Sequence, residues 1–269
     1  MSGSAVVLVL CLCALATNAF IEISPKYGPK SLGRIGSRVV GGSDASATQA
    51  PFQASLNAQG SFGWSHICGG SLVGTKTVIT AAHCCEGYSA AQLTIKYDGL
   101  GRTSLKQSST ISKVDIHANW NSQTIDWDYC VLTLTNNIVK SSTVSTIDLV
   151  QTAPAHNSPA HLTGWGKTSG STNTLPEKLQ YTPMNIVSQV ECNKIWQPAG
   201  QTVTARMICA ANAKASGCNG DSGGPLVVGG QLVGIVSWVY RGCPANTVQW
   251  PTAYADVANQ YAWLSSRIQ

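Results

Sequence analysis

Three observations predict an all-β fold for this chain of 269 residues, built as antiparallel sandwiches or barrels. Charged residues are few, at 11%, whereas Gly, Ser and Thr are frequent. That composition suits a turn-rich β protein better than a helical bundle or a disordered chain. Short strand-forming runs alternate with turn residues along most of the chain. The length is enough for one large β domain or two small ones.

The strand-forming runs are rich in Val, Ile, Leu or Thr and are separated by Gly, Ser and Asn. The clearest examples are residues 71–73, 77–80, 131–134 and 231–236. One helix is expected at the C-terminus, because apolar residues recur there at helical spacing and form one face. These residues are Val257, Tyr261, Leu264 and Ile268.

The N-terminal end differs from the rest. Residues 6–16 are apolar and uncharged, too short a run to span a bilayer, and end before Thr17, Asn18 and Ala19. This pattern predicts a secretory signal peptide over residues 1–19, although no Lys or Arg precedes the run. The alternative is a buried apolar strand. No other stretch is long enough to cross a membrane, so we expect a secreted protein.

Cysteine usage agrees with secretion. Two of the ten cysteines, Cys11 and Cys13, leave with the signal peptide. The other eight are Cys68, Cys84, Cys85, Cys130, Cys192, Cys209, Cys218 and Cys243. An even number in an exported chain predicts disulfides, and the spacings do not resemble the paired Cys-x-x-Cys ligands of a metal site.

Positive charge gathers in residues 20–38, which carry +3 of the formal net charge of +5. This segment contains two prolines, has little to bury and ends at Arg38, so we interpret it as a propeptide. The remaining chain, residues 39–269, has no run of Lys or Arg that would indicate a nucleic-acid partner.

The sequence GDSGGP at residues 220–225 has the composition of a nucleophile loop. A serine hydroxyl becomes reactive beside a base and beside donors for a negative oxygen. Small neighbours let a carbonyl approach the backbone, so the N–H groups of Gly220 and Ser222 could form an oxyanion site. The alternative is a glycine-rich surface turn, because short motifs match by chance.

Two other segments supply the partners that Ser222 needs. His83 ends one apolar strand, and Asp126 and Asp128 precede another. A neutral imidazole can take the serine proton, while a buried carboxylate holds its other nitrogen in the correct tautomer. On this reasoning either carboxylate qualifies.

Six segments, in this order, resemble the chymotrypsin-type serine proteases, and the similarity runs from Val39 to the C-terminus. They are VVGG (39–42), AAHC (81–84), DYCVL (128–132), GWG (164–166), GDSGGP (220–225) and SW (237–238). The resemblance implies two six-stranded antiparallel β-barrels with the site between them, as a secreted monomeric endopeptidase in residues 39–269. Its expected partners are protein or peptide substrates and protein inhibitors.

The resemblance also implies residue roles. His83 is the general base, Ser222 the nucleophile, and Asp128, rather than Asp126, orients the histidine. No such role falls to the four other histidines, which we expect at the surface or in packing: His66, His117, His156 and His161. Because His83, Asp128 and Ser222 are all present, an inactive binding protein on the same fold is disfavoured.

Activation and cross-linking follow from the same resemblance. A cut after Arg38 would free the ammonium of Val39 to pair with Asp221, so the intact chain is expected to be a zymogen that needs a trypsin-like activating protease. Similarity pairs Cys68 with Cys84, Cys192 with Cys209 and Cys218 with Cys243. Cys85 and Cys130 remain, each two residues beyond a proposed site residue, and are expected to bridge.

The implied substrate pocket contains Ser216, Gly217, Ser237, Trp238, Val239 and Thr252. Ser216 occupies the position where a trypsin-type enzyme has an aspartate, so a basic substrate side chain would lack its counter-charge. Val239 and Thr252 replace the glycines of broad-pocket relatives, which favours small aliphatic residues. The alternative is a chymotrypsin-like preference for large apolar residues.

No cofactor is expected for this chemistry. The loop of residues 97–109 offers Asp98 as its one carboxylate, too little for a calcium site.

Overall fold

The computed structural model describes residues 39–269. The expected signal peptide (1–19) and propeptide (20–38) lie outside the described residues. In the part of the chain that is described, no helix is long and apolar enough to cross a membrane.

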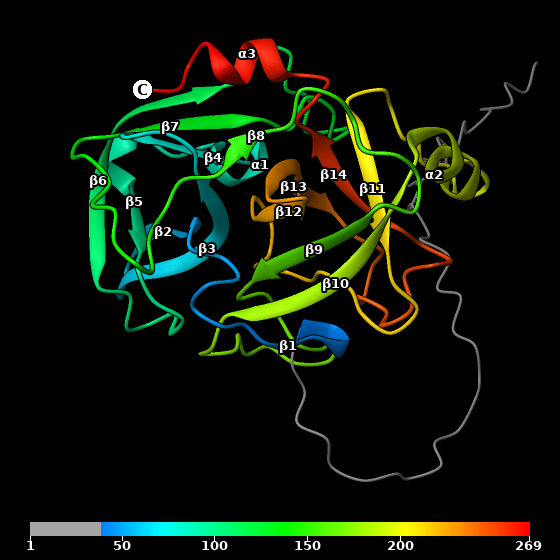
Figure 1. Ribbon diagram of the computed structural model, residues 1–269, viewed down its shortest axis with the longest axis horizontal. Helices are drawn as coiled ribbons and strands as arrows, with labels where there is room; N and C mark the ends of the chain where they lie inside the picture. The colour runs from blue at the N-terminus through cyan, green and yellow to red at the C-terminus, as the bar shows by residue number, and fades with distance from the viewer. Residues whose placement is uncertain (1–38) are drawn as a thin grey trace, which may run out of the picture. The chain divides into compact units, whose positions relative to one another are not determined.

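The N-terminal half forms a closed six-stranded barrel (Figure 1, blue to green). All its strand pairs are antiparallel, in the order β2-β3-β4-β7-β6-β5. The strands are β2 (Gln53–Gly60), β3 (Gly63–Leu72), β4 (Thr77–Thr80), β5 (Leu93–Tyr97), β6 (Gln107–Ile116) and β7 (Cys130–Leu134).

The C-terminal half forms a second barrel in the order β9-β10-β11-β14-β13-β12, closed by the pairing of β12 with β9. The strands are β9 (Pro159–Gly164), β10 (Gln180–Val187), β11 (Met207–Ala211), β12 (Pro225–Val228), β13 (Gln231–Trp238) and β14 (Thr252–Asp256). Two short strands extend it: β1 (Ser43–Asp44) pairs with β10, and β8 (Asp148–Leu149) lies parallel to β13. The two-barrel all-β fold predicted from the sequence is confirmed.

Side-chain alternation explains why these runs form barrel walls. Along β10, Thr182, Met184 and Ile186 are buried, whereas Pro183 and Asn185 between them are exposed. Successive strand residues point to opposite faces, so a period of two places one set in the core and the other in water.

The helices differ from the expectation. The C-terminal helix α3 covers only Tyr261–Ser265, although Val257 and Leu264 are both fully buried. Val257 reaches the core from the turn after β14 rather than from the helix. The longer helix α2 (Gln189–Trp196) was not predicted from the sequence. It buries only Cys192 and Trp196, so its residues show no clear apolar pattern at helical spacing. The other helices are α1 (Ala82–Cys85) and the 3-10 turns η1 (Val39–Gly41), η2 (Ala90–Gln92) and η3 (Gln197–Ala199).

Candidate active site

His83 and Asp128 meet at one end of the first barrel. His83 lies in α1, directly after β4, and Asp128 lies two residues before β7, which pairs with β4. The Nδ1 of His83 is 2.8 Å from Oδ2 of Asp128, and the backbone N–H of His83 donates to Oδ1 at 2.9 Å. The carboxylate therefore fixes both the ring and the backbone of the histidine.

A third donor reaches the same carboxylate from the second barrel. Ser237, in β13, donates its hydroxyl to Oδ2 of Asp128 at 2.5 Å. Asp128 is 1% exposed, and a buried carboxylate without donors would be costly. Three hydrogen bonds satisfy it and link the two barrels at this point.

The environment of His83 shifts its pKa in two directions. Burial lowers the pKa, but the hydrogen bond and the charge of Asp128 raise it by more, with a smaller contribution from Glu86. The net pKa of His83 lies above its usual value. An imidazole held at Nδ1 by a carboxylate can accept a proton at Nε2, which is the chemistry of a general base.

Asp126 has a different partner. Its carboxylate receives hydrogen bonds from Thr204 and from the guanidinium of Arg206, in the segment before β11. Burial raises the pKa of Asp126, but the hydrogen bonds from Arg206, Thr204 and the backbone of Trp127, together with the charge of Arg206, outweigh it, so the net pKa is lowered. Of the two carboxylates, it is Asp128, the one that the family resemblance favoured, that contacts His83.

The loop of Ser222 packs against the first barrel. The backbone N–H of Gly69, in β3, donates to the carbonyl of Ser222 at 2.7 Å. Gly220 has φ +101°, a conformation that residues with a Cβ rarely adopt. Glycine is therefore needed where the chain turns before Ser222.

His66 lies beneath this loop, a position that the sequence did not indicate. Its Nε2 is 3.0 Å from the carbonyl of Gly220, and its Nδ1 is 2.7 Å from the hydroxyl of Ser55. A carbonyl only accepts, so Nε2 carries the proton and Nδ1 accepts from Ser55. Burial lowers the pKa of His66 to about 4, so the ring is neutral at ordinary pH. The expectation of a packing residue is incomplete, because His66 also fixes Gly220.

Asp221 is fully buried next to Ser222. The backbone N–H of Gly166 donates to Oδ1 at 2.7 Å, and that of Cys218 donates to Oδ2 at 2.9 Å. A Cβ on Gly166 would lie 2.3 Å from the carboxylate carbon, so only glycine allows this approach. Burial raises the pKa of Asp221 to about 6, against the effect of these hydrogen bonds.

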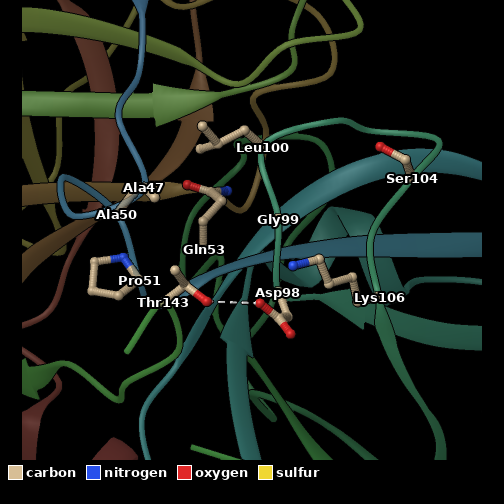
Figure 2. A pocket seen from close by; sticks show the side chains of 10 residues that line it. All are labelled: Ala47, Ala50, Pro51, Gln53, Asp98, Gly99, Leu100, Ser104, Lys106 and Thr143. Atoms are coloured by element: carbon tan, nitrogen blue, oxygen red, sulfur yellow. Dashed lines mark hydrogen bonds between the residues drawn. The ribbon is translucent and has the colours of Figure 1, made fainter. Parts of the chain in front are cut away.

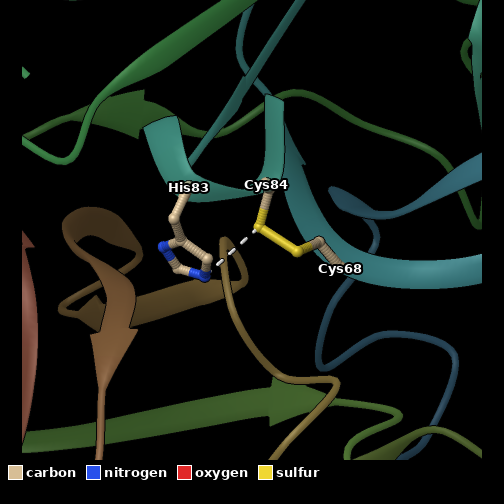
Figure 3. A group of neighbouring side chains, drawn as sticks. All are labelled: Cys68, His83 and Cys84. Atoms are coloured by element: carbon tan, nitrogen blue, oxygen red, sulfur yellow. Dashed lines mark hydrogen bonds between the residues drawn. A yellow bond between two sulfur atoms is a disulfide. The ribbon is translucent and has the colours of Figure 1, made fainter. Parts of the chain in front are cut away.

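Four disulfides join the eight expected cysteines, in the four expected pairs: Cys68–Cys84, Cys85–Cys130, Cys192–Cys209 and Cys218–Cys243. Figure 3 shows Cys68 and Cys84 beside the ring of His83, whose Nε2 is 3.6 Å from Sγ of Cys84. These three residues have the donor types of a metal site. The disulfide uses both sulfurs, and a metal ligand would be a thiolate, so we assign no metal here.

Comparison with known proteins decides the family. The model of the family described as Trypsin matches residues 39–264. Trypsin delta of Drosophila melanogaster is 37% identical over 235 residues, which cover 87% of this chain and 90% of that protein. Trypsin alpha of Drosophila erecta is 38% identical over 238 residues, and Trypsin alpha-4 of Lucilia cuprina is 35% identical over 258, or 96% of each chain. The chain belongs to the trypsin family. It is a serine endopeptidase of the chymotrypsin type.

A cavity of about 150 Å³ opens beside Ser222 in this trypsin-family enzyme. It is lined by Cys218, Asn219, Ser222, Val236, Ser237, Trp238 and Val239. Three residues expected in the pocket are not part of this lining: Ser216, Gly217 and Thr252. Ser216 and Thr252 are buried instead, at 1% and 0% exposure.

Val239 is one of the residues that line this cavity. A methyl group placed on the Cα of Gly217 would lie 4.0 Å from Cγ1 of Val239, so the valine side chain lies close to Gly217, which is outside the lining. Ser237 was expected to bind substrate, yet its hydroxyl is bound to Asp128 while the residue also lines the cavity.

Another pocket of this enzyme lies beside the loop of residues 97–109. Figure 2 shows its ten lining residues, among which Asp98 is the one carboxylate, with Lys106 nearby. Asp98 accepts a hydrogen bond from Oγ1 of Thr143 at 2.9 Å. Calcium takes six to eight oxygen ligands, so this donor set does not suit it.

Proposed function

We propose that this trypsin-family enzyme is a secreted endopeptidase, made as a zymogen, which cleaves peptide bonds after small aliphatic residues through an acyl-enzyme. Ser222 is the nucleophile in this proposal, His83 the general base and Asp128 its orienter. The backbone N–H groups of Gly220 and Ser222 stabilise the oxyanion. The bond to Asp128 leaves Nε2 of His83 as the proton acceptor.

The cavity beside Ser222 carries the proposal on specificity. Its volume of about 150 Å³ is about half of that at which pockets for drug-sized ligands begin. The branched side chain of Val239 lines it, and none of its lining residues is acidic. A small apolar side chain fits such a space, an aromatic ring is crowded, and a basic side chain would be desolvated without a counter-charge.

The environment of Asp221 supports the zymogen. Its pKa of about 6 reflects a buried carboxylate that has backbone donors but would gain from a cation. The carbonyl of Val40 accepts from the backbone N–H of Ser216 at 3.0 Å, which keeps residues 39–41 beside this region. A new ammonium on Val39, formed by a cut after Arg38, would supply that cation.

A matched peptide series tests the specificity. Four peptides differ only in the residue before the scissile bond, which is Ala, Val, Phe or Arg, and kcat/KM is measured for the cleaved protein. We expect Ala and Val to react fastest. The chymotrypsin-like alternative predicts Phe, and fastest cleavage after Arg would refute a pocket without counter-charge.

A further inference from the structure

The proposed roles leave Asp126 without a task, yet it has the densest set of donors around the loop of residues 117–129. Asp126 is 8% exposed. Its Oδ1 accepts from the backbone N–H of Trp127 at 3.0 Å, the hydroxyl of Thr204 at 2.8 Å and Nε of Arg206 at 3.2 Å. Its Oδ2 accepts from Nη2 of Arg206. The guanidinium thus contacts both carboxylate oxygens.

The backbone on either side of Asp126 is strained. Ile125 has φ 51° and Trp127 has φ 60°, so both lie in the left-handed region. That region is unfavourable for β-branched and aromatic residues and persists only where surrounding contacts hold it. Asp126, which makes the hydrogen bonds described above, is the residue between these two strained ones.

A tight turn couples this backbone to Asp128. The N–H of Tyr129 donates to the carbonyl of Trp127 at 2.8 Å, so Asp128 is the central residue of a three-residue turn. A rotation at Trp127 would therefore move the carboxylate that His83 binds.

Arg206 approaches this loop from the second barrel, one residue before β11. Its guanidinium carbon lies 5.1 Å from the centre of the Trp127 ring, and its carbonyl accepts from the hydroxyl of Tyr129 at 2.9 Å. The side chain of Arg206 thus contacts the two residues that precede Asp128 in the sequence, and its backbone contacts the residue that follows it.

We propose that Arg206 is a positioning residue of the active site. Through the carboxylate of Asp126 and the ring of Trp127 it holds the left-handed backbone that places Asp128 against His83. This inference rests on the roles proposed above for His83 and Asp128.

The chain contains a matched control. Arg267 makes the same two kinds of contact: it donates Nε to Asp115 at 3.0 Å and lies 4.0 Å from the centre of the Trp263 ring. The side chains of Arg206 and Arg267 are 28% and 31% exposed. Trp263 packs on His117, but Arg267 has no described hydrogen bond or ion pair with residues 118–128. Loss of either arginine removes one ion pair and one cation–π contact.

Arg206→Gln and Arg267→Gln are compared with the wild type in the protein cleaved after Arg38. The first readout is the low-field NMR resonance of the His83 Nδ1 proton as a function of pH, which needs no turnover. The second is kcat and KM per active site titrated with a fluorophosphonate. Asp128 and Glu86 are the charged groups that raise the pKa of His83. If Asp128 is displaced, the effect of burial remains, and burial lowers the pKa of His83.

We expect R206Q to move the His83 midpoint to lower pH and to reduce kcat by about 10- to 100-fold, with KM changed by less than about twofold. R267Q is expected to keep both values while it lowers the melting temperature like R206Q. Equal loss of melting temperature with an unchanged midpoint and kcat in R206Q would overturn the inference.

Two variants keep the test decisive if R206Q does not fold. Arg206→Lys retains the positive charge but loses the two N–H donors that contact both carboxylate oxygens. Asp126→Asn retains the shape of the side chain but loses its negative charge. Both are expected to show smaller shifts of the same sign, and unchanged values in both would overturn the inference. If the wild type hydrolyses no peptide, the proposed function fails, whereas the NMR titration still decides the role of Arg206.

Discussion

At the scale of single residues, neighbouring groups change the chemistry of common side chains. Asp128 and Asp126 are two residues apart and both are almost buried, yet one faces a histidine and the other an arginine. Ser237 adds a hydroxyl to Asp128 and none to Asp126. The residues alone left both carboxylates open, the family resemblance favoured Asp128, and the folded partners of the two agree with that choice.

Neutralising Asp128 is the sharpest change at this scale. We expect Asp128→Asn to reduce kcat/KM by about 10⁴-fold, the size known for triads of this type. The acidic limb of the pH profile should move to lower pH, because burial lowers the pKa of His83 once the raising charge of Asp128 is lost. The exposed Asp148→Asn serves as control. Unchanged activity in D128N would refute its role.

Widening the pocket should change the substrate preference. In Val239→Gly, the ratio of kcat/KM for Phe over Ala peptides is expected to rise by about 10- to 200-fold, because a side chain that lines the cavity is gone. Val139→Gly, at an exposed valine, should leave the ratio unchanged. A ratio that stays at the wild-type value would place the specificity elsewhere.

At the scale of elements, the strands could be predicted and the loops could not. Residues 77–80 and 131–134 were recognised because β-branched and apolar residues fill β4 and β7. Helix α3 is shorter than its apolar pattern, because Val257 is buried from a turn. The contacts of His66 with Ser55 and Gly220 join residues up to 154 positions apart, so no local pattern reports them.

The disulfide Cys85–Cys130 ties together the elements that carry His83 and Asp128. Replacing both cysteines by Ala is expected to cost about 2–4 kcal/mol of unfolding free energy and to reduce kcat as well. Removing Cys192–Cys209, which lies between α2 and β11, should cost stability with kcat retained. Denaturant unfolding and kinetics on each variant measure this, and a retained kcat in the first variant would show that the bridge is not needed for the site.

At the scale of the whole molecule, the two barrels contribute different parts of the proposed site. His83 and Asp128 come from the first barrel, and Ser222, Ser237 and Asp221 from the second. Cleavage after Arg38 is proposed to act on the second set through Asp221.

This proposal predicts a pH-dependent stabilisation. The folded pKa of Asp221 is about 6 against an ordinary 3.8, so between these values the folded chain keeps a proton that the unfolded chain loses. Stability of the uncleaved chain therefore falls as pH rises from 4 to 6, by about 3 kcal/mol in all. The Val39 ammonium would remove this loss. Calorimetry should show cleavage raising the melting temperature more at pH 7 than at pH 4, and an equal rise at both would contradict the pairing.

The central claim is that Ser222 becomes a reactive nucleophile after cleavage at Arg38. Mass spectrometry of peptides from fluorophosphonate-treated protein tests it directly, with uncleaved Arg38→Gln protein as control. We predict one label, on Ser222, in the cleaved protein and almost none in the control. No label on Ser222 after cleavage, or equal labelling of the uncleaved chain, would contradict the account.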